Sequence, residues 1–403
     1  MDFTLIDGHT AARKGEPFYQ RSQCENWSLN FFSISNSGFL TIEDSELDNI
    51  RVRAERFIRL EGSSHLAITN TAITNMDFAG GFIGGESEEV VLQGLVVSGF
   101  NRDHAYSSKY FTSDSGLFRF TWVTSFTFTD SVCEDNIMFA GRRFYIIESK
   151  KAFFSLANFA VATLRNNTFR RSMHSFGFFS ENESVLVIEN CTFEGDFAVG
   201  RSYIELGTDG RINTRIEESL FQGITSSFGP TVLMQVQGEL RISRTQFIDI
   251  YVFIPAGGFW YSAPLAMLYL TYAANITLDH ILARSVQIGG LRTVPLIENL
   301  LATGLLNNCQ AVQEDYMQAM ELPCAALFHI ATWTDVQVSN VDLTESGLCN
   351  SAIQIIGALG ANETLIVDQL NVNTSANYGI IAGKLLPDPS LSQCKIASFR
   401  AAA

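Results

Sequence analysis

The sequence predicts an all-β repeat protein in which about twelve short units stack into a solenoid. One phrase recurs along nearly the whole 403-residue chain: an apolar residue, a turn-forming residue two positions later, and a bulky apolar residue three positions beyond that. Its clearest copy is Ile188, Asn190 and Phe193. Most copies are roughly 24 to 36 residues apart, a spacing typical of solenoids.

The residue types within each unit predict strands. Residues 185–188 form a short apolar run, whereas Leu240 and Ile242 alternate with polar neighbours. Both patterns are typical of strands of three to five residues. A second apolar run follows several copies, as at residues 197–200. Each unit is therefore expected to supply two or three strands, with a tight turn at the middle position of the phrase.

The middle positions form a turn column that is rich in asparagine. Asparagine and glycine tolerate left-handed backbone, and stacked side-chain amides can bond one unit to the next. Asp44, Gly94 and Asp130 are acceptable substitutes, whereas four other members depart from the pattern: Glu218, Arg244, His280 and Gln369. The predicted ladder consists of Asn70, Asn166, Asn190, Asn299 and Asn340.

On this phrase and this column, the chain resembles the right-handed parallel β-helix, or pectin-lyase-like, superfamily. The resemblance covers roughly residues 36–385. It implies about twelve coils and an inward-facing asparagine ladder at one tight turn. It is much more specific for the fold than for an activity.

The expected organisation has three parts. Residues 1–35 lack the phrase and are expected to form an amino-terminal cap or linker; residues 36–385 form the β-helix, and residues 386–403 form a tail. Residues 309–322 place Val312, Tyr316 and Met320 at helical spacing before Pro323, which predicts one short helix inserted in the stack.

The formal charge of −15 argues against nucleic acid or anionic membrane as a partner. Residues 250–274 carry no charge and are long enough to cross a bilayer, but they contain Pro255 and Pro264, and the phrase resumes at Leu278. No membrane span is expected. The first twenty residues show no signal-peptide pattern, so the chain is expected to be either intracellular or a segment of a longer protein.

The cysteines have no metal-ligand spacing, and no metal or cofactor is expected. Cys133 falls in the inward column, where a buried thiol is common. Two disulfide pairs are candidates, Cys309 with Cys324 and Cys349 with Cys394.

Sequons for N-glycosylation occur seven times, and two of them, at Asn166 and Asn190, belong to the turn column. The remaining sequons favour a secreted or cell-surface protein. The glycosylation candidates are Asn26, Asn182, Asn275, Asn362 and Asn373.

No catalytic residue is predicted. The short motifs of polygalacturonase-like enzymes are absent. Residues Thr277 to His280 match a pectate-lyase motif only in part, and the arginine-containing motif expected with it is missing. His280 is therefore interpreted as a turn residue. The polar residues 101–115 are interpreted as a surface loop. Phe259, Trp260 and Tyr261 could stack on a sugar, although contact with a protein partner fits so apolar a loop better.

The function expected from the sequence is that of a non-enzymatic structural or adhesive module at the cell surface or outside the cell. Its expected partners are other protein subunits, the continuation of a longer chain, or glycans. Two alternatives on the same fold stay open, because carboxylates from different coils can converge without a local motif. They are a polysaccharide lyase or hydrolase, using Ca²⁺ or paired carboxylates, and a carbohydrate-binding module.

Overall fold

The protein is all-β in the part of the chain that a computed structural model describes. That part contains no helix, and hence no helix long and apolar enough to cross a membrane. The described residues are 32–35, 38–52, 56–78, 81–100, 117–136, 152–207, 210–228, 233–235, 238–253, 266–271, 273–288, 324–331, 335–346, 349–357, 364–374, 378–384, 394–396 and 399–401.

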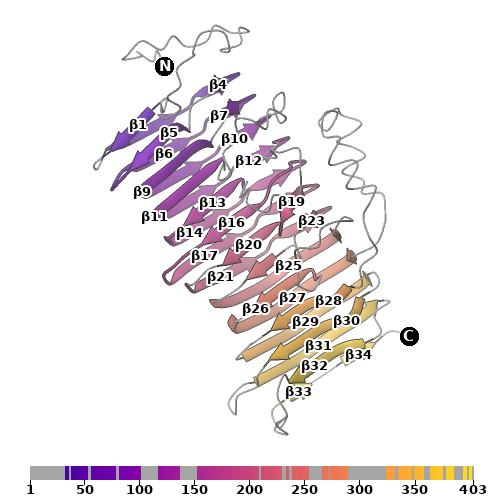
Figure 1. Cartoon of the computed structure of the whole chain (residues 1–403). Helices are drawn as coiled ribbons and strands as arrows, with labels where there is room; N and C mark the ends of the chain where they lie inside the picture. Colours follow the sequence, from indigo (N-terminus) through magenta and orange to yellow (C-terminus); the bar gives the residue numbers. More distant parts are fainter. Residues whose placement is uncertain are drawn as a thin grey trace.

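The strands form one long sheet system in which neighbours run parallel. Thirty-two described strands belong to a single sheet, and β4 (Arg51–Val52) pairs with β8 (Asp77–Phe78) in a small second one. Figure 1 shows the strands stacked one above another from the amino-terminal to the carboxy-terminal end of an elongated molecule. Equivalent strands of successive repeat units lie side by side, so the strands group into columns.

The first column carries the apolar residue that opens each copy of the phrase. The column contains β2 (Phe39–Glu43), β6 (His65–Thr69), β9 (Gly81–Gln93), β11 (Phe118–Thr129), β14 (Phe159–Arg165), β17 (Ser184–Glu189), β21 (Ile212–Glu217), β25 (Gly238–Phe253), β27 (Ala273–Ile288), β29 (Asp335–Ser346), β31 (Thr364–Thr374) and β33 (Cys394–Ile396).

The second column carries the bulky residue that closes the phrase. It includes the middle parts of β25 and β27 and the later parts of β29 and β31. Its separate strands are β3 (Glu46–Asp48), β7 (Ala72–Thr74), β10 (Val96–Ser98), β12 (Val132–Glu134), β15 (Thr168–Arg170), β18 (Thr192–Glu194), β22 (Leu220–Gln222) and β34 (Phe399–Ala401).

The third column precedes the first in each unit and includes the beginnings of β9 and β11. Its separate strands are β1 (Phe32–Ser35), β5 (Arg56–Glu61), β13 (Phe154–Ala157), β16 (Phe176–Phe179), β20 (Ile204–Gly207), β24 (Leu233–Gln235), β26 (Leu268–Thr271), β28 (Cys324–Ala331), β30 (Cys349–Gly357) and β32 (Tyr378–Lys384). Beyond the second column, β19 (Phe197–Arg201) pairs with β23 (Thr225–Phe228), which pairs with the end of β25.

The core lies between these columns and is built from stacked identical or similar side chains. Phe169, Phe193, Phe221 and Phe247 follow one another in the second column, with ring centroids 5.2, 4.6 and 4.9 Å apart and nearly parallel planes. Parallel, in-register pairing places equivalent residues directly above one another, so an aromatic residue in one unit finds the same surface in the next.

The structure confirms the predicted all-β class and the long parallel sheet, an architecture compatible with the parallel β-helix. The predicted helix at 309–322 lies outside the described residues. Strand β1 falls within the segment expected to be a cap, and β33 and β34 fall within the expected tail. The predicted ladder residue Asn299 also lies outside the described residues. Leu278 and Val338, the first-column residues on either side of it in the sequence, are direct register partners.

Candidate functional site: polar ladders at the turns

Two left-handed turns flank the short strand in most of the described repeat units. At the first turn, φ is +48° at Asn70, +56° at Asn166 and +51° at Asn190. Five residues further on, φ is again positive, as at Asn75 and Arg171. The middle residue of the phrase is therefore a left-handed turn residue, which explains why asparagine, aspartate and glycine recur there.

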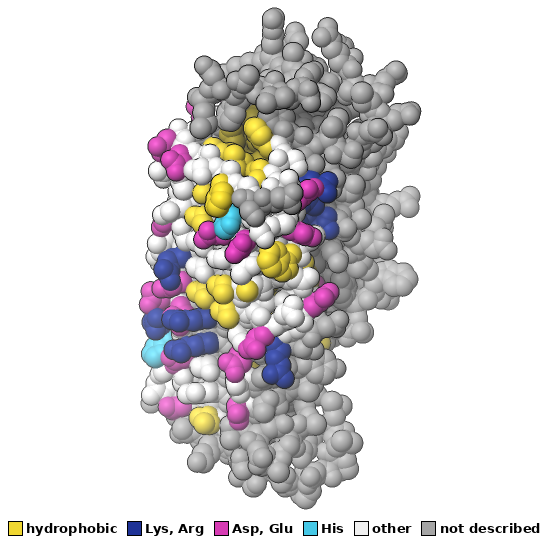
Figure 2. All heavy atoms as spheres, turned by 90° about the vertical axis from the view of Figure 1, so that its left-hand side faces the viewer, with side chains coloured by type: hydrophobic (Ala, Val, Ile, Leu, Met, Phe, Trp, Pro, Cys, Tyr) yellow, Lys and Arg dark blue, Asp and Glu magenta, His cyan; other side chains and the backbone are white. Residues whose placement is uncertain are grey.

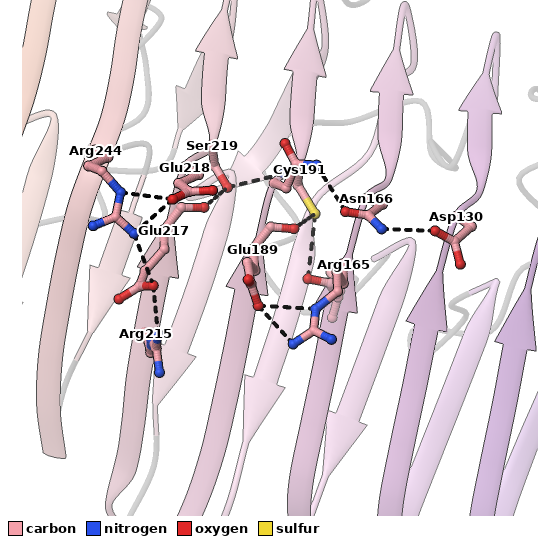
Figure 3. A network of polar contacts seen from close by, with 12 residues as sticks. Asp130, Arg165, Asn166, Glu189, Cys191, Arg215, Glu217, Glu218, Ser219 and Arg244 are labelled. Atoms are coloured by element: carbon pink, nitrogen blue, oxygen red, sulfur yellow. Dashed lines mark hydrogen bonds and ion pairs between the residues drawn. The ribbon is translucent and has the colours of Figure 1, made fainter.

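The first turn carries a ladder of side-chain amides on the outside of the molecule. The Nδ2 of Asn70 donates to Asp44 at 3.2 Å, that of Asn166 to Asp130 at 2.9 Å, and that of Asn190 to Asn166 at 2.9 Å. The bond from Asn166 lowers the pKa of Asp130. Figure 3 shows this chain of amides crossing from strand to strand.

These amides are exposed, whereas the resemblance implied that they face inward. The residue that points inward is the next one along the chain. At this inner position Ser131 Oγ accepts from the backbone N–H of Leu95, and Asn167 Oδ1 accepts from that of Ser131. Ser219 Oγ accepts from the N–H of Cys191 at 3.2 Å. Each inner side chain thus satisfies a buried backbone donor of the preceding unit, which would be costly to leave unpaired.

The second turn repeats this inner arrangement. Asn136 Oδ1 accepts from Phe100 N at 3.2 Å, Ser172 Oγ accepts from Asn136 N at 3.1 Å, and Asp196 Oδ1 accepts from Ser172 N at 2.8 Å. All three of these polar side chains are buried. The inner ladders at the two turns join neighbouring repeat units by hydrogen bonds, as the stacked phenylalanine rings join them by packing.

The inner ladder ends in a buried polar cluster that the sequence did not predict. The Tyr203 hydroxyl donates to Asp196 Oδ2 at 2.6 Å, and His174 Nε2 lies 3.3 Å from the same oxygen. Burial, together with the Asp196 carboxylate, raises the pKa of Tyr203 well above its usual value, so the phenol remains a donor. Burial likewise raises the pKa of the Cys133 thiol, which is free and fully buried as expected.

Ion pairs join units on the outer surface. Arg165 Nη2 lies 2.8 Å from Glu189, and Arg171 contacts both Glu134 and Asp135. The last residue of β21 and the residue after it are acids that arginines engage: Glu217 by Arg215, Arg241 and Arg244, and Glu218 by Arg244. Figure 3 shows Arg215 and Arg244 on either side of Glu217.

Two carboxylates, Glu217 and Asp279, are held ionised. The hydrogen bond from Arg215 is the largest cause that lowers the pKa of Glu217. Partial burial acts to raise the pKa of Asp279, but hydrogen bonds from Ser339, His280 and Asn340 together bring it to about 2. A general acid needs the opposite shift, toward neutral pH. The ionised carboxylates of Glu217 and Asp279 are suited to permanent ion pairs and hydrogen bonds.

The asparagine ladder and the glycosylation candidates occupy different places. Asn340 has a left-handed φ of +52° and donates to Asp279 at 3.2 Å. Asn182 is exposed in the turn before β17, and Asn275 is exposed with its amide 2.7 Å from Glu239. Asn373 lies in β31. Asn26 and Asn362 lie outside the described residues.

The cysteine and aromatic candidates are only partly within the described chain. Cys324 and Cys349 are register partners in the third column, whereas Cys394 is opposite Leu365 in the first. Cys309 and the aromatic loop with Phe259, Trp260 and Tyr261 lie outside the described residues, as does the loop 101–115. His280 is a left-handed turn residue, 2.9 Å from Asp279.

The sequence contained one usable signal for the inner ladder. Small polar residues follow the turn residue in several copies of the phrase, as at Thr71, Ser131, Asn167, Ser219 and Thr245. No local signal links His174, Asp196 and Tyr203, because they meet only when successive units stack. Within the described residues, no group of three or more histidine, cysteine or acidic side chains is arranged to hold a metal ion.

No protein-family model matches this sequence, and no curated protein matches it at a significant level. The ladders themselves therefore carry the functional argument.

Replacing Asn167 with alanine is expected to lower the free energy of unfolding by about 1–3 kcal/mol. The substitution removes the acceptor of Ser131 N and the donor to Phe128 O, which are 3.1 and 2.7 Å from the amide. Chemical denaturation measures the loss. Asn166→Gly is the matched control, because glycine keeps the left-handed turn and only two exposed bonds, to Asp130 and from Asn190, are lost. An equal loss in the two variants would contradict the inner assignment.

The stabilisation supplied by Asp279 is expected to disappear between about pH 4 and pH 2. Its pKa in the folded protein is about 2, below the usual 3.8, so its contribution is fully present above the higher value and is lost as pH falls through the lower one. Thermal unfolding midpoints of the wild type and Asp279→Asn, measured across this range, should differ above pH 4 and converge near pH 2. A constant difference would show that ionisation of Asp279 is not involved.

Proposed function

We propose that this chain is a right-handed parallel β-helix of about twelve coils, interrupted by one short inserted helix, that serves as a non-enzymatic structural or adhesive module of an extracellular or cell-surface assembly. The proposal assigns it to the pectin-lyase-like architecture without that architecture's usual chemistry. Its partners would be other protein subunits or further parts of a longer chain.

The observation that carries this proposal is the use of polar side chains between units. Arg165 bonds Glu189, Arg171 bonds Glu134, and Arg244 bonds Glu218 across neighbouring strands. Networks of this kind tie adjacent repeats together and add to the nearest-neighbour terms that stabilise a solenoid. A stiff rod held along its length by such contacts is well suited to spanning a distance or presenting a surface.

The electrostatics of the same side chains favour a scaffold over a hydrolase. Glu217 has a lowered pKa and three arginines within 4 Å, and the pKa of Asp279 is also lowered. Hydrolysis by paired carboxylates requires one of them to be protonated near neutral pH. In the described region, the pKa values of Glu217 and Asp279 are shifted in the direction opposite to the one that this role requires.

The test is surface labelling of intact cells that make the protein, with a membrane-impermeant cross-linker followed by mass spectrometry. We expect labelling before lysis and cross-links to other protein subunits. Labelling only after lysis would overturn the extracellular assignment. In parallel, release of reducing or unsaturated ends from neutral and acidic polysaccharides, with and without Ca²⁺, would overturn the non-enzymatic assignment.

A further inference from the structure

Two cysteines meet at the beginning of neighbouring strands in the third column. Cys324 is the first residue of β28, and Cys349 is the first residue of β30. The two strands run parallel, and the two cysteines are direct register partners. Register partners on neighbouring strands lie about 4.8 Å apart in the hydrogen-bonding direction. This separation falls within the range of about 4.4 to 6.8 Å that disulfide bonds require between the two Cα atoms.

The register also places both cysteines on the same side of the sheet. Phe328 and Ile353 are register partners four positions further along the two strands, and both are fully buried. Residues four positions apart on a strand share a side, so Cys324 and Cys349 belong to the core-facing rows of β28 and β30. Bonded cysteines have Cβ atoms about 3.8 Å apart, so the two strands need to approach by about 1 Å where they begin. Strand ends are the part of a sheet that adjusts most easily.

Each of these cysteines has a different partner among the pairs expected from the sequence, Cys394 for Cys349 and Cys309 for Cys324. Cys394 lies in the first column, opposite Leu365, whereas Cys349 lies in the third column. Cys309 lies outside the described residues. A cysteine forms only one disulfide bond, so a bond between Cys324 and Cys349 excludes both expected pairs, and an experiment can distinguish the three bonds.

The strands that carry the two cysteines lack the residues that join other units by ion pairs. Neither β28 nor β30 contains an aspartate, glutamate, lysine or arginine. Elsewhere in the stack, ion pairs such as that between Arg165 and Glu189 join neighbouring units, and Figure 2 shows basic side chains next to acidic ones on one face of the molecule. The side chains of β28 and β30 cannot form such a pair with one another. A covalent bond would supply a link between units at this position.

We propose that Cys324 and Cys349 form a disulfide bond that joins two successive repeat units. The two thiols together lose two protons and two electrons as the sulfur–sulfur bond forms. A disulfide oxidant such as oxidised glutathione takes up both, through a mixed disulfide, and is released as two thiols. The inference rests on the proposed function only in that an extracellular or secretory compartment supplies such an oxidant.

The bond closes one repeat unit into a covalent ring. The chain leaves the third column along β28 and returns to it at β30, so residues 324–349 make up one complete unit. Repeat proteins open locally, because each unit contacts only its neighbours. A unit whose ends are covalently joined cannot unwind while the bond is intact. The disulfide therefore stabilises the carboxy-terminal part of the stack against local opening.

Peptide mapping of the purified full chain under non-reducing conditions tests the proposal. The reduced chain is incubated with oxidised and reduced glutathione, in urea below the concentration that unfolds it, so that local opening lets both thiols react. After denaturation, the remaining thiols are alkylated with N-ethylmaleimide. Cleavage after glutamate then places Cys324 in the peptide 322–345 and Cys349 in the peptide 346–363. We expect molecules with these peptides linked to exceed those with both thiols free at least about tenfold, because structural disulfides resist reduction by glutathione.

The other cysteines provide the controls. Cys133 and Cys191 are free and buried, and both should be recovered as alkylated thiols. Cys394→Ser should leave the linked peptides unchanged, whereas Cys349→Ser should leave Cys324 as a free thiol. Circular dichroism shows that each sample is folded in the urea used. The wild-type map carries the test on its own if Cys349→Ser fails to fold.

Two kinds of result would overturn the proposal. One is recovery of the peptides 322–345 and 346–363 unlinked, as alkylated thiols or as separate glutathione adducts. The other is linkage of either peptide to the peptide that contains Cys309 or Cys394. Neither result bears on the proposed function, which cell-surface labelling tests separately. Conversely, the bond is measured in the purified chain, so a failure of surface labelling would leave the measured pairing unchanged.

Discussion

Replacing Phe193 with alanine is expected to lower the free energy of unfolding by about 3–5 kcal/mol. Phe193 has no exposed surface, and its ring lies between those of Phe169 and Phe221. Truncation would remove the packing of one ring and leave a cavity that the flanking strands cannot close without breaking their parallel register.

Urea denaturation monitored by circular dichroism measures this loss. Glu194→Ala serves as the matched control, because Glu194 lies on the same strand, β18, and its side chain is exposed. We expect the control to change the unfolding free energy by less than about 0.5 kcal/mol. Equal effects at the two positions would mean that the second column does not point Phe193 into the core.

Replacing Asp196 with alanine is expected to cost about 2–6 kcal/mol, because two buried donors lose their acceptor and each one left unpaired costs about 1–3 kcal/mol. The carboxylate accepts from Ser172 N and from the Tyr203 hydroxyl, and His174 lies beside it in a site with no exposed surface. Alanine leaves Ser172 N and the Tyr203 hydroxyl without this acceptor in a pocket lined by aromatic rings such as Phe176.

Two milder substitutions separate the acceptor from the charge. Asp196→Asn keeps an oxygen for Ser172 N, and Tyr203→Phe removes only the phenolic donor; each should cost less than alanine at 196. The unfolding free energies of the three variants, taken from the same denaturation experiment, decide the question. If Asp196→Asn is as damaging as Asp196→Ala, the negative charge itself is what the cluster requires.

The repeat phrase predicted the backbone better than it predicted the side chains. Its middle position is left-handed wherever it is described, even at Glu218, Arg244, His280 and Gln369, where the residue type departs from the pattern. The reason is that position in the repeat, through parallel pairing on both sides, overrides the conformational preference of a single residue.

The direction of the ladder could not be predicted in the same way. A left-handed residue turns its side chain outward, so Asn166 bonds along the surface, and its neighbour Asn167 enters the core. The phrase at residues 297–302 lies outside the described residues and stays a prediction. Leu278 and Val338, the copies on either side of it, are direct register partners.

The buried cluster could not be predicted from the sequence, because no recurring interval along the chain relates its members. His174, Asp196 and Tyr203 come from the segments around β15, β18 and β20, and only stacking brings them together. The ion pairs on the outer surface have the same origin. Arg165 and Glu189 are 24 residues apart, and their contact depends on the register between β14 and β17.

The in-register ladders also make the length of this molecule adjustable in whole steps. Asn166 and Asn190 occupy equivalent turns 24 residues apart. Excising residues 166–189 would therefore put Asn190 directly after Arg165, where its amide could take the place of the Asn166 amide beside Asp130. The cross-section would be unchanged, and the rod would shorten by one strand spacing, about 4.8 Å. Duplication of a unit would lengthen it by the same amount, so this architecture can serve as a ruler whose graduations are single repeats.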